Sequence, residues 1–358
     1  MAKLKWNFTW GIAITLVFLL LLAARLDVLQ KKTPDNTISP TIEISRSPES
    51  WMNIYQNKNK IGVIHRKFNI LDNGRFQTEE FVTMQINTMG VLQVFNVLTE
   101  TELNPDMTFS SFNFEINSSL FRFTARGYAG KDKLILYAGL PHALQKTIIP
   151  FKDVPHISGN IYEAAFRGGL EKDRTRDFSI FDPSTLALRK ISVTRQSNEI
   201  IPIMGKRVLT QKFCADFMGA KNCAWLAKDG EVLKETGMLG LSMEKVGATQ
   251  AKEGFTSREG VDFTQVASIP SNRNITAPSK LTEIKIKIDG MRDLPLLLQS
   301  GRQYFHKNIL TITREKIPDT VSQNNIPAAI LKYLQPSPLV QSSAPEMKTQ
   351  VEKIIIKT

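Results

Sequence analysis

Apolar and polar residues alternate over most of residues 51–260, which is the spacing expected of β-strands that bury one face. The segment CAWLAKDGEVLKE alternates on both sides of Asp229-Gly230. This dipeptide supports the positive φ angles of a two-residue primed turn, so we expect a β-hairpin centred on it. Neighbouring strands are expected around Val208 and Leu209 before the hairpin and around Leu239, Leu241 and Met243 after it.

Turn-forming residues divide the first part of this region into further amphipathic strands. Turns are expected at residues 57–60, Asn73-Gly74, Met89-Gly90, Pro105-Asp106 and Asp182-Pro183. Regularly spaced turns between amphipathic strands predict a large antiparallel sheet with one buried face. The phenylalanines of the segment MTFSSFNFEINSS are then expected to fill its core rather than to form a ligand cage.

The alternation is interrupted over residues 140–172. Residues Ser158 to Leu170 predict one helix, with Ile161, Ala164, Ala165 and Phe166 toward the sheet. Gly168-Gly169 is a suitable end for this helix because glycine readily adopts the left-handed conformation of a C-terminal cap. A short helix followed by a loop is expected within residues 244–260.

The first 32 residues have a different pattern. Two lysines precede an apolar run from about Phe8 to Ala24, roughly seventeen residues, which is near the lower limit for crossing a bilayer. Arg25 follows the run directly, so no small-x-small cleavage site is present, and we expect an uncleaved signal anchor. The lysines before the run favour export of the rest of the chain, whereas Arg25, Lys31 and Lys32 beyond it weaken that argument. The expected location is the inner (cytoplasmic) membrane, with most of the chain periplasmic or extracytoplasmic.

These patterns divide the chain into six parts. They are a signal anchor (1–32), a linker (33–50), an antiparallel β domain (51–260), a second linker (261–280), a small β module (281–335), and a joint with the start of a helix (336–358). Alternating isoleucines predict the small module, and Pro345 suits the first turn of the last helix, with Ser343 as its cap. The predicted fold is mainly β: a large curved antiparallel sheet, half-barrel or sandwich-like, with one or two short helices, followed by a small β module.

The chain of 358 residues carries a net charge of +12. Its Lys and Arg residues are scattered among acidic and apolar residues, without a basic helix or an aromatic–basic ribbon. This distribution argues against nucleic-acid binding and is compatible with loose attraction to anionic lipid or an envelope polymer.

Two cysteines, Cys214 and Cys223, are the only ones in the chain. In an exported domain, cysteines on neighbouring strands predict a disulfide, and two buried thiols are the alternative. The short loop between them would gain about 2–3 kcal/mol from the bond in the chain-entropy account.

No set of residues with matched catalytic roles can be named. His65, His142, His156 and His306 are scattered, and none shares a motif with a cysteine. The sequence has no metal-ligand spacing and no nucleotide-binding glycine motif, so we expect no catalytic residue, metal site or cofactor.

Several phrases, taken in order, resemble one family. They are SWMNIYQNKNKIGVIHRKF, FDPSTLALRKISV, AWLAKDGEVLKE, ASIPSNRNITAPSKLTEIKIKIDGMRDLPLLLQSGRQ and YLQPSPLVQS. This succession resembles the region ahead of the catalytic core in large bacterial transglutaminase-like proteins. The resemblance implies an exported protein whose catalytic core, of papain type with Cys, His and Asp, would follow the last phrase. Here the chain ends at Thr358, inside the helix expected to open that core, so no catalytic residue is carried over.

Three functions are compatible with these patterns. The first is a membrane-anchored, non-catalytic envelope module that binds or positions a transglutaminase-like or other envelope protein. The second is a periplasmic carrier of lipid or lipoprotein acyl chains, suggested by the Phe-rich strands and the apolar helix near Ile161. The third is a part of a truncated or split enzyme of the transglutaminase or cysteine-peptidase type.

Overall fold

The computed structural model describes residues 48–119, 122–217, 220–254, 262–269, 271–289, 298–315 and 328–355. The predicted signal anchor and most of the first linker lie outside these residues. Among the helices that the structure describes, none is long and apolar enough to cross a bilayer.

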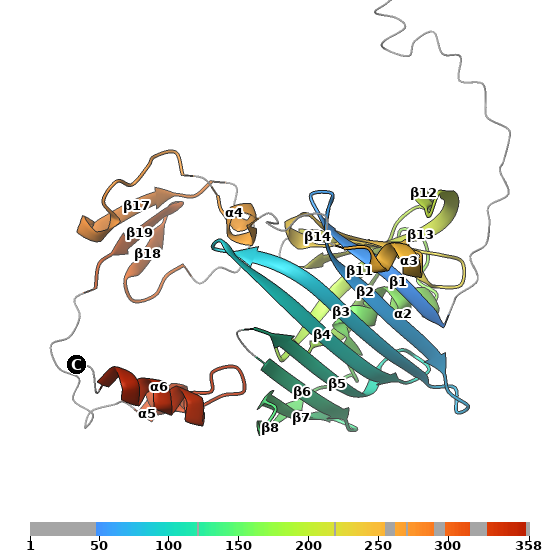
Figure 1. The fold of residues 1–358 in the computed structure, drawn as a ribbon, viewed down its shortest axis with the longest axis horizontal. Coiled ribbons are helices and arrows are strands. Elements are labelled where there is room, and N and C mark those ends of the chain that lie inside the picture. Colours follow the sequence, from blue (N-terminus) through green and yellow to red (C-terminus); the bar gives the residue numbers. More distant parts are fainter. Residues whose placement is uncertain are drawn as a thin grey trace, which may run out of the picture. The chain divides into compact units, whose positions relative to one another are not determined.

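Residues 49–246 form one large, mostly antiparallel sheet of 16 strands (Figure 1). Its first half is a meander in which each strand pairs with the next. These strands are β1 (Glu49–Gln56), β2 (Asn59–Ile70), β3 (Phe76–Thr88), β4 (Val91–Leu103), β5 (Phe109–Ser118), β6 (Arg122–Ala129), β7 (Lys133–Leu140) and β8 (Ala143–Pro150). The turns expected at Asn73-Gly74, Met89-Gly90 and Pro105-Asp106 all separate strands here, as the sequence predicts.

The second half of the sheet joins the first where β16 pairs with β1. Its strands are β9 (His156–Ile157), β10 (Thr175–Asp182), β11 (Ala187–Arg195), β12 (Glu199–Ile203), β13 (Lys206–Phe217), β14 (Ala220–Leu226), β15 (Val232–Thr236) and β16 (Leu241–Val246). In the order of pairing, β8 and β9 are the two edges, so the described strands do not close into a barrel. The predicted mainly β fold with a large antiparallel sheet is therefore confirmed.

Short helices accompany the sheets. They are η1 (Ser158–Asn160), α2 (Ile161–Arg167), η2 (Met238–Gly240), α3 (Ala248–Lys252), α4 (Phe263–Ala267), η3 (Pro278–Lys280), α5 (Ala328–Leu331), η5 (Lys332–Leu334) and α6 (Pro345–Ile355). The last helix begins at Pro345, where the missing N–H of proline leaves no intrahelical bond unmade.

The helix α2 lies on the inner face of the large sheet and is enclosed by its two halves (Figure 1). Ile161, Ala164 and Ala165 are buried, and Phe166 packs against the same core, as the helical spacing predicts. Gly168 caps the helix and the following Gly169 has a φ of 64°, so the expected helix end is also correct.

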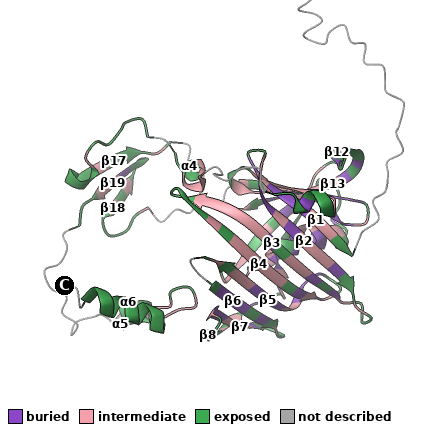
Figure 2. Ribbon diagram, viewed as in Figure 1, coloured by how far each residue is buried: buried purple, intermediate pink, exposed green. Residues whose placement is uncertain are grey.

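One apolar core occupies this inner face, and buried positions recur along the strands around it (Figure 2). Phe109, Phe112 and Phe181 pack together, with ring centroids 5.3–6.1 Å apart. The phenylalanines of β5 are therefore core residues, which is the expected role.

A smaller core lies on the outer face under the hairpin of β12 and β13. Its buried members are Ile201, Ile203, Val208, Cys214, Cys223, Trp225, Ala227 and Leu233. Residues 206–210 of β13 pair with β12 and form the hairpin over this core, whereas residues 211–217 of β13 pair within the main sheet.

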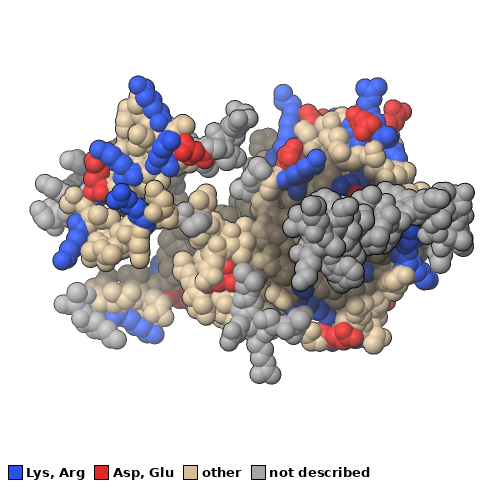
Figure 3. Space-filling view, turned by 90° about the horizontal axis from the view of Figure 1, so that it is seen from above, with Lys and Arg blue, Asp and Glu red and all other residues tan. Residues whose placement is uncertain are grey.

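A separate sheet of three strands follows in the chain. β19 (Ile309–Thr313) is its centre, and β17 (Glu283–Lys287) and β18 (Gln303–His306) pair with it on either side. Charged residues of both signs are interspersed with uncharged residues on the face shown in Figure 3.

Two details of the sequence-based prediction are wrong. Asp229-Gly230 does not form a two-residue primed turn. The Gly230 N–H donates to Ala227 O (3.0 Å), and the Ala227 N–H donates to Glu231 O (2.8 Å). Among the described residues of this loop, only Gly230 has a positive φ (83°). This is a three-residue loop with glycine in the left-handed position. The strand β8 was also missed, since its half-exposed edge position leaves a weak alternation.

Candidate functional site

A row of polar side chains crosses the apolar inner face of the sheet. Arg66 on β2 lies opposite Glu80 on β3, Glu80 lies opposite Thr99 on β4, and Thr99 lies opposite Phe114 on β5. The next row on one side is wholly apolar and consists of Ile64, Val82, Val97 and Ile116. We call Arg66, Glu80 and Thr99 the polar row.

A cavity of about 210 Å³ lies over the polar row. Alternate residues of β2–β5 form its floor, because successive side chains of a strand point to opposite faces. Its other walls come from η1 and from the turn after β10. The lining residues are Arg66, Thr78, Glu80, Val97, Thr99, Thr101, Phe114, Ile157, Ser158, Gly159, Asn160, Asp182, Pro183 and Ser184.

Arg66 is the central cation of this site. Its Nε donates to Glu80 Oε2 at 2.7 Å, and its Nη1 lies 3.4 Å from Glu163 Oε1 on α2. Burial alone would lower the pKa of Arg66, but the charges of Glu80, Glu163 and Glu235 outweigh it and raise that pKa. Arg66 is therefore a fixed positive charge surrounded by carboxylates.

Glu235 on β15 belongs to the same charged cluster but does not line the cavity. Burial raises its pKa to about 7, and the negative charges of Glu163 and Glu80 add to this effect, while Arg66 opposes it. Three carboxylates near one guanidinium cannot all be neutralised by it. The raised pKa of Glu235 lets its carboxyl hold a proton up to near-neutral pH, which reduces the excess negative charge.

The helix α2 is attached to both halves of the sheet by polar contacts. Glu163 meets Arg66 on β2, and the Tyr162 hydroxyl donates to Asn222 O on β14 (3.2 Å). Burial raises the pKa of Tyr162, so this hydroxyl keeps its proton and remains a donor. These contacts hold the segment that covers the cavity.

Asn160, the last residue of η1, is buried beside the cavity and 7% exposed. Its Nδ2 group is buried and has no hydrogen-bond partner in the structure. A buried donor without a partner costs about 1–3 kcal/mol. Such a group at a cavity wall is available to donate to an acceptor in the cavity.

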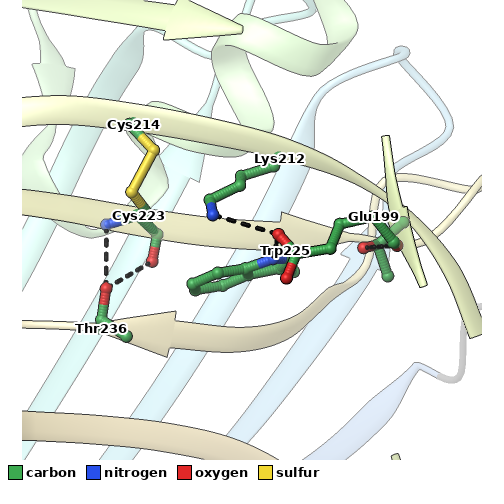
Figure 4. Close-up of polar contacts among 7 residues, drawn as sticks. Glu199, Lys212, Cys214, Cys223, Trp225 and Thr236 are labelled. Atoms are coloured by element: carbon green, nitrogen blue, oxygen red, sulfur yellow. Dashed lines mark hydrogen bonds and ion pairs between the residues drawn. A yellow bond between two sulfur atoms is a disulfide. The ribbon is translucent and has the colours of Figure 1, made fainter. Parts of the chain in front are cut away.

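The sulfur atoms of Cys214 and Cys223 lie at bonding distance, 2.10 Å, on directly opposite residues of β13 and β14 (Figure 4). Both cysteines belong to the outer core, beside Trp225. The Trp225 indole donates to Glu199 Oε2 (2.9 Å), and Lys212 Nζ donates to the same oxygen (3.0 Å). These two hydrogen bonds lower the pKa of Glu199. This part of the outer face is a structural core rather than a cavity wall.

The four histidines lie on different elements. His65 stacks on Trp51, His156 Nδ1 bonds to Met107 O (2.9 Å), His142 lies between β7 and β8, and His306 ends β18. Burial lowers the pKa of His156. Within the described part of the chain, no three His, Cys, Asp or Glu residues form a potential metal site.

Sequence reasoning missed the polar row, Glu163, Glu235 and Asn160. A signal for the row exists in the strands: Arg66 occupies the inward position between Ile64 and Phe68 on β2. A charged residue at a core-facing position of an amphipathic strand is unusual and indicates a paired or functional group. The pairing itself follows only from the register of the strands.

Comparison with known proteins gives structural similarity alone. No family model and no curated protein matches the sequence. Among solved structures, the chain is similar to a beta-barrel-like protein of the domain of unknown function DUF1849 from Brucella abortus, with a TM-score of 0.41 and 13% identity over 55% of this chain and 93% of that chain. A DUF1089 family protein from Pseudomonas aeruginosa has a TM-score of 0.32 and 11% identity over 54% of this chain and 92% of that chain. Similarity at this level does not indicate what the chain binds.

Proposed function

We propose that this chain is a non-catalytic binding module of the bacterial cell envelope, whose ligand occupies the cavity over the polar row. The observation that carries the proposal is the polar row itself. Charged and hydroxyl side chains interrupt an apolar inner face at the place where a cavity of about 210 Å³ lies. An apolar row at this place would stabilise the core better, so a ligand is a reason for the polar residues.

The chemistry of the site supports binding rather than catalysis. Cys214 and Cys223 are bonded to each other, and a thiolate nucleophile requires a free cysteine. Glu235, whose pKa is near neutral, does not line the cavity and therefore does not reach a ligand there. The Arg66 and Glu80 side chains that line it are engaged with each other.

The cellular setting of the proposal comes from the sequence. The apolar run from about Phe8 to Ala24 supports an anchor in the inner membrane, with the sheets on the outer side. The resemblance to the region before the catalytic core of transglutaminase-like proteins supports a partner of that kind. In this proposal the module binds a small envelope component and presents or positions it for the partner.

A ligand screen on the full chain tests this function. The unfolding temperature is measured with monosaccharides, amino acids, short peptides and palmitate, each added to the wild type and to two variants. Thr99→Met fills the cavity, and Thr311→Met changes a strand residue of the small sheet that does not line it. We expect at least one probe to stabilise the wild type and Thr311→Met but not Thr99→Met.

Two results would count against the proposal. If no probe stabilises the wild type, or if Thr99→Met responds as the wild type does, the cavity is not a binding site. A hydrolase or transamidase activity of the purified chain that is lost in Cys214→Ser would contradict its non-catalytic character. Stabilisation by palmitate alone would favour the carrier of acyl chains.

A further inference from the structure

We infer that the cavity over the polar row takes one ring-sized polyhydroxylated ligand, a neutral or amine-bearing sugar unit, and discriminates against acidic sugars. This inference rests on the binding function proposed above and names the class of its ligand.

The size of the cavity sets the first limit. A volume of about 210 Å³ has room for several water molecules or for one compact molecule, since a single water needs at least about 10–15 Å³ of cavity. Pockets for drug-sized ligands are larger, about 300–1,000 Å³. A single pyranose ring fits this volume.

The hydrogen-bonding groups set the second limit. The buried Asn160 Nδ2 needs an acceptor, and hydroxyl side chains from three elements line the same space, among them Thr78, Thr99 and Ser158. Hydroxyl side chains both donate and accept, and so do the hydroxyl groups of a sugar. A ligand with several hydroxyl groups can therefore meet all of these partners at once.

An apolar wall completes the recognition surface. Phe114 lies next to Thr99 across the strands, and Val97 precedes Thr99 on the same face of β4. A sugar ring has an apolar C–H face as well as its hydroxyl groups, and it can rest on such a wall while its edges bond to the polar row.

The charge of the site selects among sugars. The guanidinium of Arg66 is already bonded to Glu80 and lies near Glu163, and the carboxylate of Asp182 adds a further negative charge to the lining. A carboxylate on the ligand would meet excess negative charge without an available cation, so it is disfavoured. A neutral ring or one with an ammonium group avoids this repulsion.

Titration calorimetry or saturation-transfer NMR on the full chain tests the inference with four probes. Glucose, N-acetylglucosamine, glucosamine and glucuronic acid share one ring and differ in their charge and substituents. We expect at least one of the first three to bind saturably, and at least tenfold more tightly than glucuronic acid.

Variants connect this binding to the cavity. Asn160→Asp replaces the unpaired Nδ2 donor by an acceptor, and Asn160→Leu removes the donor. Each variant is expected to weaken sugar binding at least tenfold. Circular dichroism should show that both variants remain folded. Asn274→Leu, an exposed asparagine outside the cavity, is the matched control and should bind as the wild type does.

The outcomes separate the inference from the function on which it rests. Equal affinity for glucuronic acid, or unchanged binding in both folded Asn160 variants, would overturn the sugar assignment. If none of the four sugars binds but a peptide, an amino acid or palmitate stabilises the wild type and not Thr99→Met, the binding function stands and the sugar inference fails. If no probe of either experiment binds, both are wrong.

Discussion

Arg66 determines the electrostatics of the inner face. A cation at this position needs the Glu80 and Glu163 carboxylates, because an unpaired buried charge costs several kcal/mol. Burial is the larger cause that raises the pKa of Glu235 to about 7, and the charges of these two carboxylates raise it further. One inward-facing arginine is thus linked to the protonation of a glutamate on β15.

The stability of the protein should depend on Glu235 near neutral pH. Its carboxyl holds a proton up to about pH 7 when folded but only up to about pH 4.5 when unfolded. The folded state therefore binds more protons between these values, and the free energy of unfolding decreases as the pH rises through them. Glu235→Gln, which keeps the neutral form, should be equivalent to the wild type below about pH 4.5 and more stable by about 3 kcal/mol at pH 8.

Urea unfolding at several pH values measures this difference. Glu171→Gln is the control, because Glu171 is exposed and should give a difference near zero throughout. A stability difference for Glu235→Gln that does not change between pH 5 and pH 8 would show that Glu235 does not titrate in this range.

Gly230 is required for two separate reasons. Its φ of 83° is left-handed, and a Cβ at this position would lie 2.8 Å from the ring of Phe166 on α2. Gly230→Ala should lower the free energy of unfolding by about 2–3 kcal/mol, through backbone strain and overpacking together. Gly205→Ala has a similar φ of 74° but open space around the Cβ, so it should cost only about 1 kcal/mol. Equal losses for the two variants would contradict a close contact with Phe166.

At the scale of elements, the short helices depend on contacts with the sheet. An isolated helix as short as α2 or α3 is not stable in water. α2 is held by the Glu163 and Tyr162 contacts, and α3 is held by Lys60 on β2. The Lys60 Nζ donates to Gln250 O, Ala251 O and Glu253 O at 2.7–3.1 Å, which satisfies carbonyls at the helix end.

Removing this lysine should release α3. Lys60→Met keeps the length of the side chain but leaves the carbonyls without their donor, and should cost about 2–4 kcal/mol. Hydrogen exchange of residues 248–252 and urea unfolding measure the effect, with Lys131→Met, an exposed turn lysine, as the control. Unchanged protection of these amides in Lys60→Met would mean that α3 is held by other contacts.

The disulfide joins β13 and β14 in the middle of their pairing. Replacing both cysteines by alanine should lower the free energy of unfolding by about 2.5 kcal/mol, the chain-entropy value for so short a loop. The double variant is compared with the wild type under non-reducing conditions. Alkylation of both thiols in denatured, unreduced protein would contradict the bond.

At the scale of the whole molecule, we expect the two sheets to differ in stability. They share no hydrogen-bonded strand pair among the described residues. The large sheet surrounds an extensive core, whereas in the small sheet Leu310 alone is buried among the described residues 298–315. Less buried apolar area means less stabilisation.

Hydrogen exchange should separate these units. Amides of β17, β18 and β19 should exchange at least a hundredfold faster than those of the central strands β13 and β14, because the small sheet can open without the large one. The edge strand β8 should exchange at intermediate rates. A single rate class for both sheets would contradict their independence.

The sequence by itself determined the class of fold. Each segment carries local preferences that do not depend on the rest of the chain, such as alternation with a period of two and turns at Asn73-Gly74 and Met89-Gly90. Strands, hairpins and the helix at Ile161–Arg167 could therefore be predicted. The outer-edge strand β8 was missed because it buries little and therefore alternates weakly.

Only the tertiary structure decided where the candidate site lies. Arg66, Glu80, Thr99 and Asn160 stand far apart in the chain, and their meeting depends on the register of β2–β5 and on α2 lying across the inner face. Register and docking are set by the packing of the whole core rather than by any one segment. The pattern of the chain therefore predicts strands with one charged residue on the buried face, and the assembled sheet brings those residues together around a cavity.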